Sequence, residues 1–143
     1  MRLLGVLLVA VVLFAGVAVS ATAADNVLTV TPGTVNFGAK PVGSSTIKST
    51  TITNVSDEPI LLTLSLVRSW DDFAGGRTES TCFLSSGEPI LLAPGESCTL
   101  VEAFFSTGDF VGIKQDQIWL ATATEPESAV LETEKIVFFG RTR

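Results

Sequence analysis

Leu92-Ala93-Pro94-Gly95-Glu96-Ser97-Cys98 ends one apolar run with a turn and begins the next run. Two earlier stretches, Val35-Asn36-Phe37-Gly38 and Ile52-Thr53-Asn54, also place turn residues at the end of an apolar, β-rich run. Pro followed by Gly suits a type II turn, because Pro presets the first central residue and Gly accepts the positive φ of the second. Together the three stretches predict a β-sandwich.

The rest of the chain repeats this pattern of short β runs separated by Gly, Pro, Asn and Asp. The residues between 60 and 67 alternate so that one face is fully apolar, and no helical period is convincing. Each apolar face must bury against a second layer, so we expect an all-β, immunoglobulin-like antiparallel β-sandwich of about seven or eight strands. The expected strands include residues 28–31, 35–37, 45–54, 60–67, 82–84, 97–105, 118–120 and 136–139.

The N-terminal residues predict export. Arg2 is the only charge in the first 24 residues, an apolar run spans residues 3–19, and small residues follow. This order is typical of a secretory signal peptide, and Ala21-Thr22-Ala23 places cleavage before Ala24 or Asp25. The apolar run is long for a signal peptide and slightly short for a membrane span, so an uncleaved anchor stays open. We expect a signal-peptide helix at residues 1–23 and one exported domain at residues 25–143, secreted or in the cell envelope.

Composition narrows the class of partner. Without residues 1–23 the chain keeps 8 basic and 15 acidic residues, a net charge of −7. An acidic chain with no basic cluster is a poor partner for nucleic acid or anionic lipid. Membrane contact is therefore expected only through the N-terminal segment, if that segment is not cleaved.

Cys82 and Cys98 are the two cysteines of the chain. An even count in an exported chain predicts a disulfide, which would close a loop of about 15 residues and contribute about 3 kcal/mol in the chain-entropy model. Two buried free thiols are the alternative. No metal site is expected, because the chain has no His to complete a two-cysteine site.

Catalytic chemistry is not expected either. A nucleophilic Ser needs a base, and no His exists. Asp71 and Asp72 are the obvious carboxylate pair, but neighbours on a strand point to opposite faces, so we expect a solvated loop there. Glu102 shares a face with the apolar residues of its run, which predicts a bulge or an edge position. We expect no enzyme and no cofactor.

Four motifs in this order resemble the choice-of-anchor D domains and the related ASH and hydin-type domains: Val35-Asn36-Phe37-Gly38, Val42-Gly43-Ser44, Ile52-Thr53-Asn54 and Leu92-Ala93-Pro94-Gly95-Glu96-Ser97-Cys98. Those families are immunoglobulin-like sandwiches akin to the major sperm protein (MSP) fold. The resemblance covers residues 28–140 and implies a binding or scaffolding module. The chain departs from the pattern at Ser106, where the family often has Pro, and at Glu102, where an apolar residue is expected.

The turn residues of these motifs have structural explanations. Gly38, Gly43 and Gly95 suit positions with positive φ, Pro94 presets its turn, and Asn54 can bond loop amides. Asn54-Val55-Ser56 also matches a glycosylation acceptor, so both interpretations of Asn54 stay open at this point.

Three aromatic residues, Trp70, Phe73 and Phe110, lie in loop-like regions and are candidates for contact with a partner. Capping the ends of the sandwich is the alternative. The leading hypothesis is a non-catalytic binding or structural module that offers a sheet edge, or residues 70–80, to an unidentified extracellular or envelope protein. The alternative is a soluble extracellular carrier or inhibitor that binds a small ligand or an enzyme through the Trp70–Ser80 loop.

Overall fold

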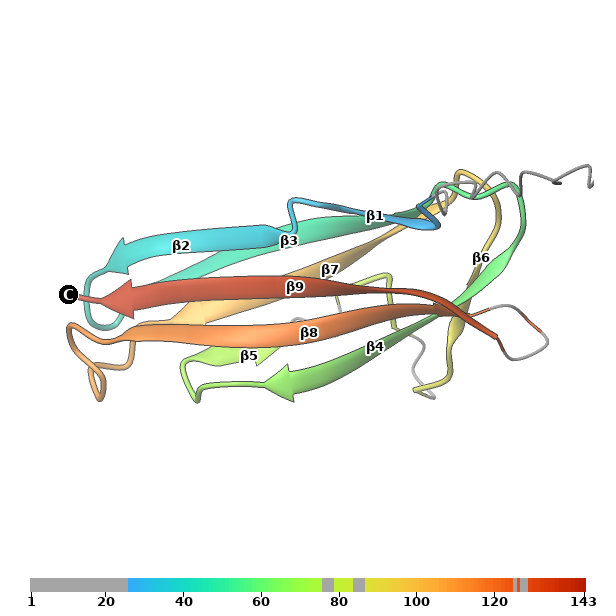
Figure 1. The fold of residues 1–143 in the computed structure, drawn as a ribbon. Helices are drawn as coiled ribbons and strands as arrows, with labels where there is room; N and C mark the ends of the chain where they lie inside the picture. The colour runs from blue at the N-terminus through green and yellow to red at the C-terminus, as the bar shows by residue number, and fades with distance from the viewer. Residues whose placement is uncertain (1–25, 76–78, 84–86, 125, 127–128) are drawn as a thin grey trace, which may run out of the picture.

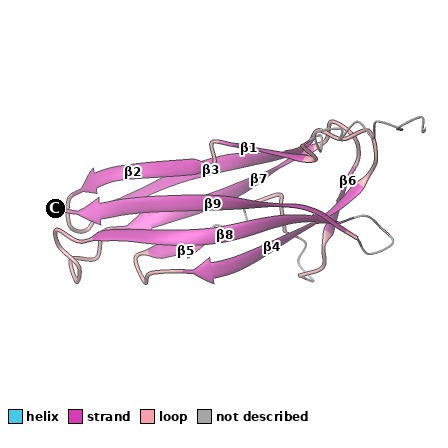
Figure 2. Ribbon diagram, in the orientation of Figure 1, coloured by secondary structure: helices cyan, strands magenta, loops and turns pink. Residues whose placement is uncertain are grey.

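In a computed structural model, the described part of the chain forms nine strands in two sheets (Figure 1). The structure describes residues 26–75, 79–83, 87–124, 126 and 129–143. The expected signal peptide, residues 1–23, lies outside them. No helix occurs in the described part of the chain (Figure 2), and accordingly none there is long and apolar enough to cross a membrane.

The two sheets have the strand orders β1-β3-β7-β5 and β2-β9-β8-β4-β6. This arrangement confirms the predicted immunoglobulin-like sandwich, with nine strands among the described residues in place of the expected seven or eight. The expected antiparallel pairing holds except between β2 and β9, which pair in parallel. The strands are β1 (Leu28–Thr31), β2 (Thr34–Lys40), β3 (Ser45–Asn54), β4 (Ile60–Arg68), β5 (Phe73–Gly75), β6 (Ile90–Leu92), β7 (Ser97–Phe105), β8 (Lys114–Thr124) and β9 (Val130–Thr142).

The chain changes sheets between its first two strands. β1 pairs antiparallel with β3, whereas β2 pairs in parallel with β9 of the other sheet. The crossing lies at Pro32, whose peptide bond with Thr31 is cis. Glu132 of β9 holds the start of β1, because its carboxylate accepts hydrogen bonds from the N–H groups of Val27 and Leu28, both at 2.6 Å. The start of β1 is thus tied to both sheets, to β3 by strand pairing and to β9 through Glu132.

Four buried phenylalanines form the centre of the core. The ring of Phe37 lies 5.9 Å from Phe73, 5.7 Å from Phe104 and 6.3 Å from Phe138 between centroids. These rings come from β2, β5, β7 and β9, so both sheets contribute to one cluster. Such ring pairs stabilise a core beyond the area they bury.

The strand pattern differs from the sequence-based expectation in two regions. β8 and β9 extend well beyond the apolar runs at 118–120 and 136–139, because they pair with each other along their length. The expected strand at 82–84 is wrong where the structure describes it. The N–H groups of Thr81 and Cys82 donate to the Thr99 carbonyl, at 2.9 and 3.3 Å, and the Thr99 N–H donates to the Thr81 hydroxyl at 2.8 Å, but these residues form no strand. β5, which the sequence did not predict, pairs with β7 in the same sheet.

Cys82 and Cys98 form a disulfide with a Cα–Cα distance of 5.0 Å. It links the segment after β5 to the start of β7. Both cysteines are buried, at 3% and 4% exposure, so the bridge is part of the core.

The turn residues adopt the expected geometry. Gly95 has a φ of 76°, and the N–H of Glu96 donates to the Ala93 carbonyl at 2.9 Å, which is the hydrogen bond of a type II turn. Gly38 and Gly43 also have positive φ, of 76° and 79°.

Asn54 is fully buried beside this turn. Its Nδ2 donates to the carbonyls of Glu58 at 2.8 Å and Leu92 at 3.0 Å, and its Oδ1 accepts from the Ser56 N–H at 2.9 Å. The folded domain therefore uses Asn54 as a structural clamp, and no glycan can attach to it there.

Candidate functional site

One edge of the five-stranded sheet is open along most of a strand. β4 pairs with β8 on one side, but β6 covers its other side only from Ile60 to Leu62. Within the residues that the structure describes, no strand pairs with the free side of residues 63–68. Figure 1 shows β4 as the lowest strand, with its arrowhead end far from β6.

This open edge is apolar. Leu64 is half-buried against the core, Leu66 is 48% exposed, and both follow Ile60 and Leu62 on the face toward the other sheet. A bulge at Val67 breaks the register with β8 and leaves that side chain 60% exposed. An unpaired apolar edge is a template for a further strand, and the bulge marks where regular pairing would stop.

The four-stranded sheet also has a partly open edge, but a lysine side chain, Lys48, lies along it. β1 covers β3 only from Thr51 to Asn54, so residues 45–50 have no strand beside them among the described residues. Lys48 lies in this stretch on the face toward the other sheet, and its ammonium donates to the Asn36 carbonyl at 2.8 Å. An inward-pointing lysine is a known way to block strand addition. The β4 edge carries no charge before Arg68.

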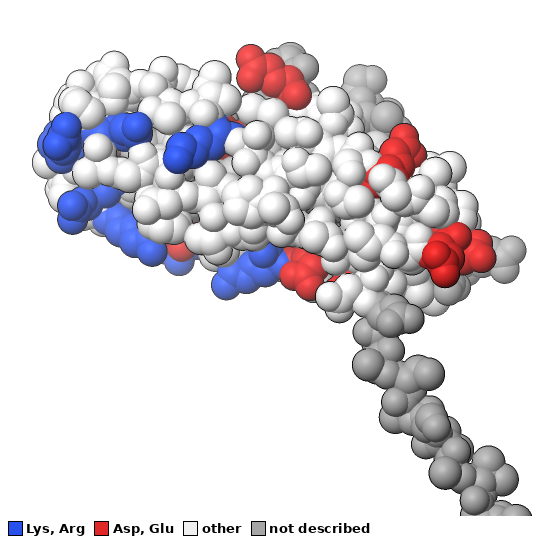
Figure 3. Space-filling model, turned by 90° about the horizontal axis from the view of Figure 1, so that it is seen from above, with Lys and Arg blue, Asp and Glu red and all other residues white. Residues whose placement is uncertain are grey.

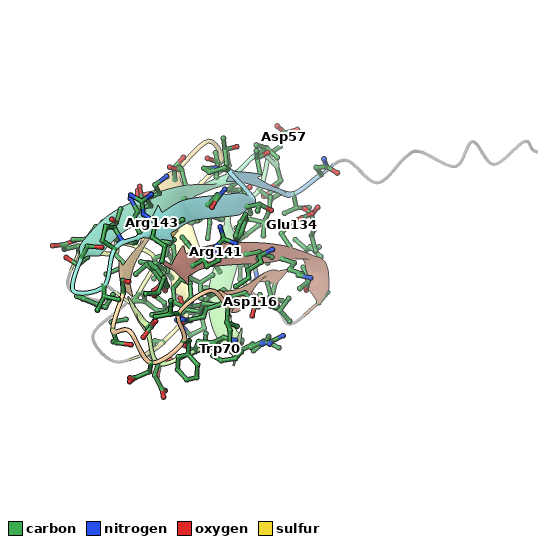
Figure 4. All side chains as sticks on the ribbon, turned by 90° about the vertical axis from the view of Figure 1, so that its left-hand side faces the viewer. Asp57, Trp70, Asp116, Glu134, Arg141 and Arg143 are labelled. Carbon is green, nitrogen blue, oxygen red and sulfur yellow. A yellow bond between two sulfur atoms is a disulfide. The ribbon has the colours of Figure 1, made fainter. Side chains whose placement is uncertain are left out.

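An aromatic corner, formed by Arg68, Trp70 and Phe110, lies at the end of β4. The Trp70 and Phe110 rings meet edge to face, 5.2 Å apart, and the Arg68 guanidinium lies 5.9 Å from the Trp70 ring centroid. Arg68 also pairs with Asp116 at 3.1 Å. Figure 4 shows Trp70 at the lower margin of the end-on view, below Asp116. Partner contact at Trp70 and Phe110, both half-exposed, stays a prediction.

Phe73 does not belong to this surface. Its side chain is only 6% exposed and its ring lies 5.1 Å from Phe104 in the core, because β5 pairs with β7 and turns the ring inward. The expectation of partner contact is therefore wrong for Phe73.

Asp72 is fully buried, so the expected solvated loop is wrong for this residue. Its carboxylate accepts hydrogen bonds from the Thr107 hydroxyl and, at 2.7 Å, from Gln115 Nε2 of β8. The Gln115 bond connects the segment before β5 to β8 of the other sheet, whereas Thr107 lies just after β7 of the same sheet as β5. The other amide atom, Gln115 Oε1, is buried and has no hydrogen-bond partner among the described residues.

Glu102, on β7, is a second fully buried carboxyl residue besides Asp72. The predicted bulge or edge position is wrong, because β7 keeps an unbroken register with β3 and β5 on its two sides. One terminal atom of the Gln117 amide lies 2.8 and 3.1 Å from the two Glu102 oxygens, and the Trp119 indole also hydrogen-bonds to the carboxyl. Burial raises the pKa of Glu102 to about 7, and the Trp119 bond opposes this rise.

A shallow hollow of about 290 Å³ lies on the outer face of the five-stranded sheet, away from residues 70–80. Lys114 and Arg141 line it as cross-strand neighbours, and the Lys114 ammonium lies 4.0 Å from the Phe139 ring centroid. Figure 3 shows Lys and Arg gathered toward one end of the visible face and most Asp and Glu toward the other.

No protein-family model matches the sequence, and no curated protein matches it. Solved structures do match. The ASH/PapD-like domain 7 of human CEP192 has a TM-score of 0.63 at 11% identity, over 85% of this chain and 89% of that one. The fold is that of an ASH/PapD-like immunoglobulin sandwich.

Two further structures share this ASH/PapD-like sandwich. SSP-19, an MSP-domain protein of Caenorhabditis elegans, has a TM-score of 0.54 at 10% identity, over 79% of this chain and 98% of that one. The E. coli chaperone DraB has a TM-score of 0.51 at 17% identity, over 80% of this chain and 54% of that one. Likenesses at such identity establish the fold alone. The ASH and MSP-like resemblance is confirmed at that level, and the choice-of-anchor D assignment stays a prediction.

Sequence reasoning located the aromatic corner in part but missed the open edge of β4. The strand itself was predicted from its alternation. The free side of β4 exists because β6 is only three residues long. The apolar run around residues 89–92 gives no signal of where the pairing between β6 and β4 ends. The buried carboxyls were missed because their amide partners lie on β8, far away in the sequence.

Proposed function

We propose that this domain is an exported, non-catalytic protein-binding module that accepts a strand from its partner on the free edge of β4. The observation that carries the proposal is the free side of β4 at residues 63–68, where the described part of the chain places no strand and where Leu64, Leu66 and Val67 provide apolar side chains. The predicted signal peptide and the buried disulfide support an oxidising location outside the cytoplasm.

The geometry indicates what the partner strand would look like. It would lie beside β4 where β6 ends, continuing the row that β6 begins at Ile60–Leu62. Backbone hydrogen bonds to β4 would provide affinity independent of sequence. Apolar side chains at every second position would cover Leu64 and Leu66, and a residue near Trp70 would meet the aromatic corner.

The alternative function, a carrier or inhibitor that uses the Trp70–Ser80 loop, has less support. Phe73 is in the core, residues 76–78 lie outside the described part of the chain, and the hollow described above lies elsewhere. We therefore do not develop it as a second function.

Leu66→Lys tests the proposal, with Ile47→Lys as its matched control. Both leucine and isoleucine are about half exposed, at 48% and 58%, and both lie on strands. A lysine at position 66 points toward the other sheet and blocks an added strand, whereas position 47 lies on the outer face of the other sheet. We expect the exported protein to retain a partner from envelope extract, the L66K variant to lose it, and the I47K variant to keep it. Retention by L66K, or equal loss from both variants, would contradict strand addition on β4.

A further inference from the structure

Glu102 lies in a setting where its charge has no compensation. The side chain is fully buried, and the one ion pair among the described residues joins Arg68 to Asp116 instead. Two charged groups on the elements around Glu102 point into the sandwich, whereas Lys114 and Asp116 lie on the outer face of β8. Lys48 is the cross-strand neighbour on β3, but its ammonium bonds to a backbone carbonyl of β2, and Asp72 before β5 is itself a buried acid. β8 contributes an amide and an indole, which are neutral.

The Gln117 amide links Glu102 to the surface. One end of the amide lies 2.8 Å from the nearer Glu102 oxygen, and the other end lies 3.1 Å from Ser69 Oγ. Ser69 Oγ also lies 3.2 Å from the Trp70 carbonyl, to which it donates. These contacts form an unbroken chain from the buried carboxyl to the aromatic corner.

Two orientations of this amide fit the same distances. With Oε1 toward the carboxyl, the contact at 2.8 Å is a hydrogen bond only if Glu102 is protonated and donates its O–H. With Nε2 toward the carboxyl, the amide donates to an ionised Glu102, and its oxygen accepts from Ser69. The proton on Glu102 therefore decides which orientation is favoured.

We propose that Glu102 is a proton sensor whose protonation state sets the orientation of the Gln117 amide and, through it, the hydrogen bond that Ser69 makes. When Glu102 is protonated, Gln117 Nε2 donates to Ser69 Oγ, which leaves the single Ser69 hydroxyl hydrogen free to bond the Trp70 carbonyl. When Glu102 releases its proton to solvent, the amide turns over and Ser69 donates to Gln117 Oε1. The Trp70 carbonyl then loses the Ser69 hydroxyl and keeps only the Phe73 N–H, at 3.0 Å, as a donor.

Burial moves the ionisation of Glu102 to near neutral pH. Because burial raises the pKa of Glu102 to about 7, both forms are populated near neutral pH. The hydrogen-bond chain from Glu102 through Gln117 and Ser69 to the Trp70 carbonyl is called the relay below. It rests on the proposed function and deepens it, since it regulates the aromatic corner at the end of the binding edge. Its test uses no partner, so a failed relay and a failed strand-binding proposal are distinguishable.

The test is ¹⁹F NMR of the exported protein labelled with 5-fluorotryptophan, titrated between about pH 5.5 and 8.5. The chain has two Trp and no His, so few other groups titrate in this range. Trp119 touches Glu102 and reports its ionisation directly, whereas Trp70 reports the far end of the relay. We expect both resonances to shift with one midpoint near 7. A flat Trp119 or a flat Trp70 resonance would overturn the proposal.

Ser69→Ala cuts the relay at an exposed position and leaves Glu102 in place. In this variant we expect the Trp119 resonance to titrate as before and the Trp70 resonance to lose its shift. Glu102→Gln should flatten both resonances, and Asp57→Asn, at an exposed carboxyl, should change neither. If E102Q does not fold, S69A still decides, because a Trp70 shift of wild-type size in S69A contradicts the relay.

Discussion

At the scale of single residues, the buried carboxyls are the unusual feature of this sandwich. Glu102 of β7 and Asp72, which precedes β5, are fully buried, and each contacts an amide on β8 of the other sheet. For Glu102, burial raises the pKa and favours the protonated form. The stability of the fold should therefore depend on pH through Glu102.

Glu102→Gln should remove this pH dependence. Because burial raises the folded-state pKa from 4.5 to about 7, the folded protein holds a proton between these values that the unfolded chain releases. The contribution of Glu102 to stability is therefore greatest below pH 4.5 and falls as the pH rises to about 7, after which it is level. From pH 5 to 7.5 the loss should be about 2 kcal/mol. Urea unfolding at these two pH values measures it.

Asp57→Asn is the control for this experiment, because it removes one exposed carboxyl and should preserve the wild-type pH dependence. A wild-type stability that does not fall over this interval beyond the change seen in E102Q would show that Glu102 is ionised in the folded protein.

At the scale of elements, the approach of β9 to β7 sets the thickness of the sandwich. Gly140 of β9 faces the ring of Phe104, and a Cβ added there would lie 3.0 Å from three ring carbons. Phe104 is fully buried, so the ring has little freedom to move away. Glycine at this position is therefore required by packing and not by its backbone conformation.

Gly140→Ala should lower the free energy of unfolding by about 1–3 kcal/mol, the usual effect of overpacking a core. Gly33→Ala is the matched control, because its added Cβ would meet only the Val30 carbonyl oxygen, at an ordinary 3.9 Å. Chemical denaturation of the two variants beside wild type measures the difference. Equal stability of G140A and G33A would show that the two sheets can shift to accept the methyl group.

The elements also show how far the sequence could lead. β3, β4 and β7 were predictable because alternation and turn residues are local signals. β5 was not, because a strand of three residues has no period and forms only by pairing with β7. Glu102 was misplaced because its partner is distant in the sequence. The alternation of its strand correctly put Glu102 on the inner face, but the amide that hydrogen-bonds to it is at position 117, on β8.

At the scale of the whole molecule, the described residues leave an apolar edge open along β4 and place a lysine along the open part of β3. The Lys48 side chain lies along the open part of β3, whereas residues 63–67 of β4 carry no charged side chain. Soluble domains normally cover or charge such an edge, so an apolar edge left open indicates a place for a partner.

Export itself is directly testable. We expect the protein produced in its own cells to begin at Ala24 or Asp25, because the predicted cleavage site follows Ala21-Thr22-Ala23. Intact mass measurement of the exported protein distinguishes this from a chain that keeps residues 1–23, which would point to the membrane-anchored alternative.

The most direct test of strand addition is photo-crosslinking in the producing cells. A photoreactive residue is placed at Ser65, on the open edge of β4, or at Ser49, on the edge of β3 that carries Lys48; both side chains are exposed. We predict a discrete protein adduct from position 65 that is absent from position 49 and absent when Leu66→Lys is added. An adduct from position 49 alone, or one from position 65 that survives L66K, would contradict the proposal that β4 is the binding edge.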